Sequence, residues 1–355
     1  MRPPSASDAL SAAAARFAAD LAAVVGRPLG ERERVALAVS GGPDSMAMLL
    51  LAHAALPGRV AVATVDHRLR AAAADEAAMV AGYCAAIGVP HTTLVPSEPI
   101  AGTSIQARAR AARYALLGEW AAGIDVRIIA TAHHADDQAE TFLMRANRGS
   151  GPGGLSGIRA RWTWDHHRWH GGYPRGGVVG VADVTSVTVV RPLLRWRRSE
   201  LREIVEAAGA PFVTDPTNDD ARYDRARMRA LLAAHPELDA PLLARSAEAC
   251  AESDAALTAM LDLLWRERSR EIDASECALD MARLPRELRR RLTRAAIGYV
   301  RSVQGIAEGQ WADGTNIEPL LDALEAGATA TQAGVIGSVD GDVWRFAAAP
   351  PRRAL

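Results

Sequence analysis

The sequence of 355 residues contains no lysine, and all 41 of its basic residues are arginine. Catalysis through a lysine Schiff base, with a carbonyl substrate or with pyridoxal phosphate, is therefore excluded. Cysteine is scarce as well. Cys84, Cys250 and Cys277 stand far apart without a Cys-x-x-Cys pair, which argues against a disulfide framework or a cysteine zinc site and fits a reducing compartment.

Long hydrophobic runs are also missing. No stretch of about 18 apolar residues occurs, so no segment is expected to span a membrane. The alanine-rich start contains Arg16 and Asp20, which favours an amphipathic helix over a secretory signal. With 49% hydrophobic residues, 23% charged residues and a net charge of −1, the composition is that of a globular protein. We expect a cytoplasmic location.

The first half of the chain alternates short apolar runs with helical stretches. The runs that predict buried strands are Arg34–Val39, Arg59–His67, His91–Val95, Val126–His134 and Val187–Leu194. The segments that predict helices are Pro43–Ala55, Ala73–Ile87, Ser104–Ala122 and Ala135–Ala146. Such alternation predicts an α/β fold with a doubly wound, mainly parallel sheet of about five strands. In these sheets the site lies at the carboxyl ends of the strands.

Composition also predicts three regions. Residues 1–30 form a leader helix, and residues 31–235 form the sheet domain, with an irregular Gly/Pro/Trp/His-rich insertion at about 147–180. Residues 236–355 read as a mostly helical domain whose end, at Asp340-Gly341, predicts a hairpin turn.

One turn predicts phosphate binding. The residues after the first strand are Ser40, Gly41, Gly42, Pro43, Asp44 and Ser45. The glycines allow a sharp turn that exposes backbone N–H groups, and proline suits the first position of a helix whose positive end attracts anions. Asp44 would repel phosphates unless a cation lay between them, so this carboxylate implies Mg²⁺. The simpler alternative is an ordinary strand-to-helix turn.

Polar groups follow two further strands. Asp66 and His67 end the second strand, where the chain either contacts a nucleotide or simply leaves the sheet. His133, Asp137 and Glu140 follow the fourth, and the two carboxylates share a helix face at a spacing of i, i+3. Together they could coordinate Mg²⁺, hold an ammonium group or accept a proton from an amine. Helix capping accounts for one acidic residue here but not for both.

Arginine is concentrated in three segments: Arg191–Arg202, Arg222–Arg229 and Arg283–Arg301. Each segment is either a solvated helix surface, which is the commoner case, or a surface for nucleic-acid phosphates. Arg110 and Arg113 share a helix face, which is likewise either a solvated surface or a surface for phosphates. The histidine-rich stretch Trp164–His170 favours contact with RNA or adventitious metal binding over a catalytic zinc site.

The turn at Ser40–Ser45 lacks the lysine of a Walker loop and the spacing of a dinucleotide fold, and it resembles the PP-loop of ATP pyrophosphatases. Together with further segments in the same order, it resembles the bacterial tRNA(Ile)-lysidine synthase family. The matching segments include "VDHRLR", "QARARAARY", "HHADDQAETFLMRANRGSGPGGLSGI", "RPLLRWRRSELREI" and "DPTNDDARYDRARMR". The resemblance covers roughly Val35 to Leu232.

The resemblance implies an activity and its partners. The family joins free L-lysine to C2 of the wobble cytidine in the CAU anticodon of an isoleucine tRNA, through an adenylated cytidine, and releases AMP and pyrophosphate. It implies ATP and Mg²⁺ as cofactors, with pyrophosphate held at Ser40–Ser45 and the metal at Asp44. It also implies catalytic roles for Asp137 and Glu140, with His133 and Arg113 in support, and tRNA contacts in residues 236–355.

The chain departs from the family pattern at one place, since Ala226 follows Arg225 where the family commonly has asparagine. Three other functions compete with the lysidine hypothesis. A PP-loop tRNA thiolase would also adenylate a base, but its sulfur chemistry usually needs cysteines near the motifs. A small-molecule amide synthetase would not need the arginine-rich helices. A non-catalytic nucleotide-binding domain would leave Asp44, Asp137 and Glu140 unexplained.

Overall fold

The computed structural model describes residues 6–69, 72–102, 104–164, 186–214, 224–272, 276–306, 311 and 314–350. The described residues up to Glu252 form one compact unit, and those from Ser253 onward form a second. The boundary falls within helix α9 (Ala240–Arg268). Among the described helices, none combines the length and apolarity that crossing a bilayer requires.

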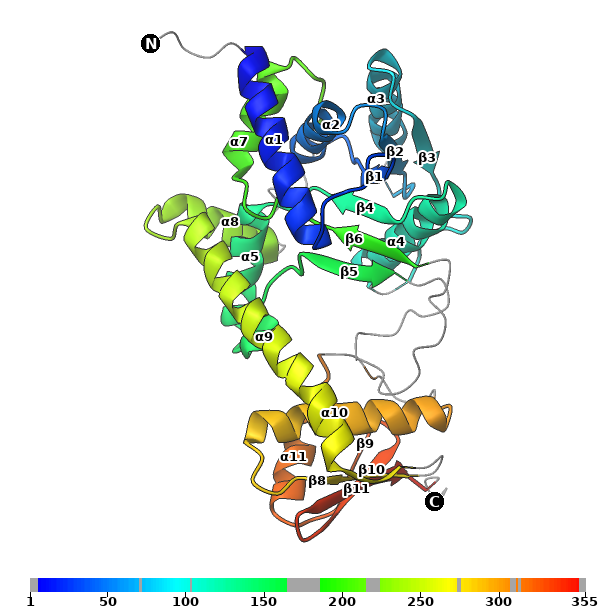
Figure 1. Ribbon diagram of the computed structural model, residues 1–355, viewed down its shortest axis with the longest axis vertical. Coiled ribbons are helices and arrows are strands. Elements are labelled where there is room, and N and C mark those ends of the chain that lie inside the picture. Colours follow the sequence, from blue (N-terminus) through cyan, green and yellow to red (C-terminus); the bar gives the residue numbers. More distant parts are fainter. Residues whose placement is uncertain are drawn as a thin grey trace. The chain divides into compact units, whose positions relative to one another are not determined.

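The first unit is built on a six-stranded sheet with the strand order β3-β2-β1-β4-β6-β5. Its strands are β1 (Val35–Ala38), β2 (Val60–Val65), β3 (His91–Leu94), β4 (Ile128–Thr131), β5 (Arg161–Trp164) and β6 (Val187–Val190). All neighbours pair in parallel except β5, which runs antiparallel to β6 at the edge of the sheet. The predicted doubly wound, mainly parallel sheet is confirmed (Figure 1).

Helices cover both faces of this sheet because successive strand residues point to opposite sides. Those of the first unit are α1 (Ala6–Val25), α2 (Pro43–Ala55), α3 (Ala72–Ala86), α4 (Ile105–Gly123), α5 (Ala135–Ala146), α6 (Pro152–Leu155), α7 (Arg198–Ala207) and α8 (Asp224–Ala234). Leu37 of β1 packs with α1, α2, α3 and α7, whereas the adjacent Ala36 packs with α4. Phe17 and Leu21 of α1 are fully buried in the same core as α2, so the helix predicted at the start of the chain is part of this core.

The predicted irregular insertion at about 147–180 needs correction. It contains the short helix α6 and the edge strand β5, because antiparallel pairing with β6 orders the chain despite its high glycine content. Most of the histidine-rich stretch lies outside the described residues, and of it only Trp164 is placed, buried at the end of β5.

The second unit contains more sheet than the sequence indicated. Its five antiparallel strands follow the order β7-β8-β11-β10-β9, with α10 (Arg286–Val303) and α11 (Glu318–Glu325) packed on them. The strands are β7 (Ser269–Ile272), β8 (Glu276–Asp280), β9 (Ala330–Gln332), β10 (Val335–Asp340) and β11 (Val343–Ala348). The hairpin predicted at Asp340-Gly341 is confirmed by the pairing of Asp340 with Val343.

Candidate functional site

The carboxyl ends of four adjacent parallel strands bring the predicted polar residues to one edge of the sheet. In spatial order, Asp66 follows β2, Ser40 follows β1, His133 follows β4 and Arg191 follows β6. The strand order reverses between β1 and β4, and ligands of doubly wound folds bind in the crevice at such a reversal. The candidate site therefore lies between the turn after β1 and the start of α5.

The turn after β1 has the geometry of an anion-binding loop. Gly41 adopts φ +86°, and Gly42 caps α2 with Pro43 at the first helical position. The Ser45 hydroxyl donates a hydrogen bond to the Gly42 carbonyl at 2.9 Å and accepts one from the Ser40 N–H at 3.1 Å. These bonds fix the loop in a conformation that places the positive end of α2 at the site.

Asp44 is held in an unusual position on the first turn of α2. Its Oδ1 is buried and has no hydrogen-bond partner among the residues that the structure describes, and its Oδ2 lies 3.4 Å from Nε2 of His134. A buried carboxylate oxygen without a partner carries a free-energy penalty unless a ligand compensates it. Asp44 is therefore suited to a bound cation.

His134 is a site residue that the sequence analysis missed. Its side chain is 1% exposed, and its ring lies within 3.5 Å of carboxylate oxygens of Asp44, Asp136 and Asp137. Burial alone would lower its pKa, but the three carboxylates outweigh this and raise the pKa to about 9. His134 thus links the phosphate loop to α5. Its place directly before the helix, three residues ahead of Asp137, was the available signal.

Asp137, in the first turn of α5, also contacts His134. One of its oxygens accepts a hydrogen bond from the backbone N–H of His134 at 3.1 Å, and the other lies 3.8 Å from Arg225 Nη2. Burial would raise the pKa of Asp137, but the charges of His134 and Arg225 lower it overall. The carboxylate is accordingly ionised at neutral pH.

Glu140 has a different environment, although it shares a helix face with Asp137. Its side chain is 1% exposed and accepts hydrogen bonds from three arginines that lie on α7 and α8. The bonds come from Arg198 Nη2 at 3.0 Å, Arg225 Nε at 3.1 Å and Arg229 Nε at 3.0 Å. Both oxygens are engaged, so Glu140 anchors α7 and α8 on α5.

This arrangement predicts a large effect on stability. Glu140→Ala leaves three guanidinium groups without their shared counter-ion, and breaking a buried ion pair costs about 3–5 kcal/mol. Urea denaturation should show this loss in the free energy of unfolding of the first unit. Glu206→Ala is the matched control, because Glu206 is exposed and pairs with the exposed Arg202, so its loss should cost less than about 1 kcal/mol. Equal losses for both variants would contradict the anchoring role.

The two remaining histidines of the site are neutral groups. Burial, followed by the charge of Arg191, lowers the pKa of His133 to about 3. Its Nδ1 accepts from Arg191 Nε at 3.3 Å and lies 3.0 Å from the Thr131 hydroxyl. His67 accepts a hydrogen bond through Nε2 from Arg113 Nε at 3.4 Å, and within the described part of the chain its buried Nδ1 has no partner.

The magnesium alternative for His133, Asp137 and Glu140 does not match this geometry. Glu140 gives both oxygens to arginines, and His133 faces Arg191. Within the described part of the chain, no group of three or more histidine, cysteine or acidic side chains is arranged to hold a metal. Any Mg²⁺ in the site would thus depend on ligand phosphates together with Asp44, which is the usual way this ion is bound.

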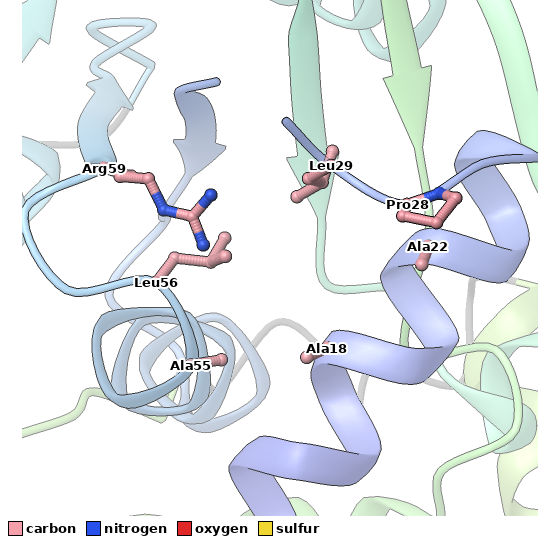
Figure 2. A pocket seen from close by; sticks show the side chains of 7 residues that line it. All are labelled: Ala18, Ala22, Pro28, Leu29, Ala55, Leu56 and Arg59. Atoms are coloured by element: carbon pink, nitrogen blue, oxygen red, sulfur yellow. The ribbon is translucent and has the colours of Figure 1, made fainter. Parts of the chain in front are cut away.

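A cavity of about 230 Å³ lies elsewhere in the first unit, at the amino end of β2 (Figure 2). Ala18 and Ala22 on α1 line it opposite Ala55 at the end of α2. Its one charged lining residue, Arg59, donates a hydrogen bond to the Gly30 carbonyl at 2.8 Å. No carboxylate, imidazole or hydroxyl lines this cavity, so it results from packing against small alanines and is not the site.

Comparisons with known proteins give matches over most of the chain. A family model described as a PP-loop domain matches residues 13–235. The chain is 42% identical over 347 residues to a tRNA(Ile)-lysidine synthase of Novosphingobium aromaticivorans, covering 98% of this chain and 97% of that protein. It is 41% identical over 320 residues to one of Zymomonas mobilis, covering 90% of each.

A solved structure is similar in fold. A U34-tRNA thiolase from Methanococcus maripaludis matches with a TM-score of 0.50 and 15% identity, over 68% of this chain and 79% of that one. At this identity the similarity concerns the fold alone.

Proposed function

The chain belongs to the tRNA(Ile)-lysidine synthase family, and we propose that it joins free L-lysine to the wobble cytidine of the CAU-anticodon isoleucine tRNA. The reaction consumes ATP and releases AMP and pyrophosphate. The observation that carries this proposal is the pairing of a phosphate-binding turn with an ionised carboxylate, Asp137, across one buried histidine, His134. One group serves the nucleotide and the other serves the amine.

The nucleotide is assigned to the turn after β1. The backbone N–H groups at the start of α2 and the hydroxyl of Ser40 bind the departing pyrophosphate, with Asp66 and His67 beside the nucleoside part. The buried Oδ1 of Asp44, which no described residue hydrogen-bonds, fits Mg²⁺ bound jointly by this carboxylate and the phosphates. When bound, the ion supplies positive charge that stabilises the leaving group.

Lysine is assigned to Asp137 rather than Glu140. An ammonium group needs a carboxylate with a free oxygen, and both oxygens of Glu140 are occupied by arginines. Arg225 Nη2 lies 3.8 Å from Asp137 Oδ1, which is beyond hydrogen-bond distance. Glu140 acts instead as a positioning residue, since it holds Arg225 beside Asp137.

The chemistry then follows in two steps. The cytosine O2 attacks the α-phosphorus, the bond to pyrophosphate breaks, and C2 becomes electrophilic. An amine of lysine attacks C2, and the bond from C2 to the AMP oxygen breaks. Asp137 takes the proton that the amine loses when the carbon–nitrogen bond forms. Arg113, paired with His67, supplies positive charge beside the reacting phosphate.

Residues 236–355 are assigned a second set of tRNA contacts. Their described part from Ser253 onward forms a unit with its own hydrophobic core, which supports such a surface.

The cysteines argue against a thiolase. Burial raises the pKa of Cys84 to about 11 in the core of the first unit, and burial raises that of Cys277 to about 12 in the second unit. A thiol at such a pKa is not a nucleophile at neutral pH. Cys250 lies on α9, and no cysteine follows a strand of the parallel sheet at its carboxyl end.

The proposal is tested by following pyrophosphate release with ATP and Mg²⁺ in three mixtures: without RNA, with unmodified isoleucine tRNA, and with methionine tRNA, which shares the CAU anticodon. Release should require the isoleucine tRNA, and labelled lysine should appear on that RNA. Release with a small molecule and no RNA would agree with the assigned phosphate site but would contradict the assignment of tRNA as the substrate. Transfer of sulfur in place of lysine would establish the thiolase.

A further inference from the structure

The arginine-rich segments of the sequence are largely neutralised within the fold. In Arg191–Arg202, Arg195 pairs with Glu248 and Arg202 pairs with Glu206. Arg225 and Arg229 pair with Glu140. On α10, the arginines pair with nearby carboxylates: Arg286 with Glu318, Asp322 and Glu325, Arg290 with Glu287 and Glu318, and Arg291 with Asp254 and Glu287. Richness in arginine therefore does not identify a surface with free positive charge.

A different group of arginines has no carboxylate partner among the residues that the structure describes. Arg108 and Arg110 are exposed on α4, and Arg159 is exposed just before β5. None of the three forms an ion pair with a described carboxylate. Arg108 donates a hydrogen bond to the Ala101 carbonyl, at 3.0 Å.

Contacts between side chains connect these arginines to the site. The guanidinium of Arg110 lies 5.1 Å from the centre of the Tyr114 ring, and the Tyr114 hydroxyl lies 3.2 Å from Arg191 Nη2. Arg191 also donates to the Arg159 carbonyl and, at 3.3 Å, to His133. Arg110 and Arg159 are thus joined through a buried arginine that contacts the site.

The same contacts bring an aromatic residue to this surface. Trp162 of β5 packs edge-on against Tyr114, with ring centres 4.9 Å apart and planes at 82°. Trp162 remains partly exposed between the exposed residues Arg161 and Thr163. Arginine combined with a partly exposed aromatic ring is typical of single-stranded RNA contacts, where bases stack and phosphates pair.

Arginines without counter-ions repel one another, and this repulsion raises the electrostatic free energy of the protein. The charges of Arg110 and Arg159 lower the pKa of Arg191, and that of Arg110 also lowers the pKa of His133, in both cases after the larger effect of burial. A bound polyanion removes this repulsion. The electrostatic free energy of these arginines is consequently higher in the free protein than in a complex with nucleic acid.

We propose that Arg108, Arg110, Arg159 and Trp162, the α4–β5 surface, bind the backbone of the tRNA anticodon loop next to the site. The identity of the RNA rests on the proposed function, while the surface itself rests on the geometry. The phosphates of ATP have the same chemistry, but they are assigned to the turn after β1, so this surface is committed to RNA.

Binding of the full chain to unmodified isoleucine tRNA, measured without ATP at several salt concentrations, tests this. Arg110→Gln with Arg159→Gln should weaken binding about tenfold and reduce the salt slope by about two. Arg195→Gln with Arg202→Gln is the matched control, because both arginines are exposed but paired, and binding should change less than about twofold. Restoring charge with Arg110→Lys and Arg159→Lys should recover most of the salt slope, which a fold defect would not allow.

Equal weakening by both pairs of substitutions would overturn the assignment, as would unchanged binding by the first pair. A raised KM for ATP with unchanged tRNA binding would mean that these arginines serve the nucleotide. Lysine transfer by the unsubstituted protein is measured separately. If that protein binds tRNA through this surface but transfers no lysine, the proposed function is wrong, whereas the assignment of the α4–β5 surface to RNA is supported.

Discussion

Asp44→Asn is expected to reduce pyrophosphate release by about 10²–10³-fold, the usual loss when a group that stabilises a leaving anion is removed. The substitution keeps the size of the side chain and removes its charge. The buried Oδ1 has no hydrogen-bond partner in the described structure, and Oδ2 faces His134 at 3.4 Å. An amide at this position would bind Mg²⁺ poorly, so the metal and the pyrophosphate would lose their shared anchor.

A metal titration separates this role from a fold defect. Raising the Mg²⁺ concentration should recover part of the activity of Asp44→Asn, because a weakened metal site fills at higher concentration. Asp75→Asn is the control, since Asp75 also lies in the first turn of a helix, α3, but is exposed and far along the chain from the turn after β1. Its activity should stay within twofold of the unsubstituted protein. Release by Asp44→Asn within a few-fold of normal would rule out the metal role.

The predicted helices agree best with the structure where the chain carries clear end signals. Pro43–Ala55 and Ala135–Ala146 have the bounds that the sequence indicated. The first begins after two glycines and a proline at its first position, and the second begins at a capping residue. Strand β5 was missed because it lies within glycine-rich sequence and most of its residues are not buried. Its pairing partner, β6, lies beyond residues 165–185, and local patterning carries no information about such a partner.

The site was predictable to the level of the helix face and no further. The i, i+3 spacing correctly placed Asp137 and Glu140 on one side of α5. It gave no sign that arginines 58, 85 and 89 residues further along the chain would all hydrogen-bond to Glu140. For the same reason, the sequence analysis singled out His133 and not the adjacent His134. The fold buries His133 and pairs it with Arg191, both of which lower its pKa, and it places His134 among three carboxylates, which raise its pKa.

This difference between two carboxylates on one helix leads to the most discriminating result that we expect. Asp137→Asn should slow lysine transfer by about 10²–10⁴-fold, the range for removal of a proton acceptor, and leave pyrophosphate release from ATP and tRNA within about tenfold of normal. Adenylated tRNA should accumulate, since its formation needs the turn after β1 and its consumption needs the amine. Rapid quenching of a single turnover with labelled ATP measures both steps.

Glu140→Gln is the companion variant in that experiment. Because its three arginines come from the elements that flank the site, losing the charge should disturb both steps together. A fall in lysine transfer alone, with normal adenylation, would instead identify Glu140 as the proton acceptor. The role of Asp137 would then be limited to capping α5. Two variants on one face of α5 thus separate a carboxylate that reacts from one that holds the surrounding helices in place. That separation arises because Asp137 keeps an oxygen clear of close arginine bonds and Glu140 does not.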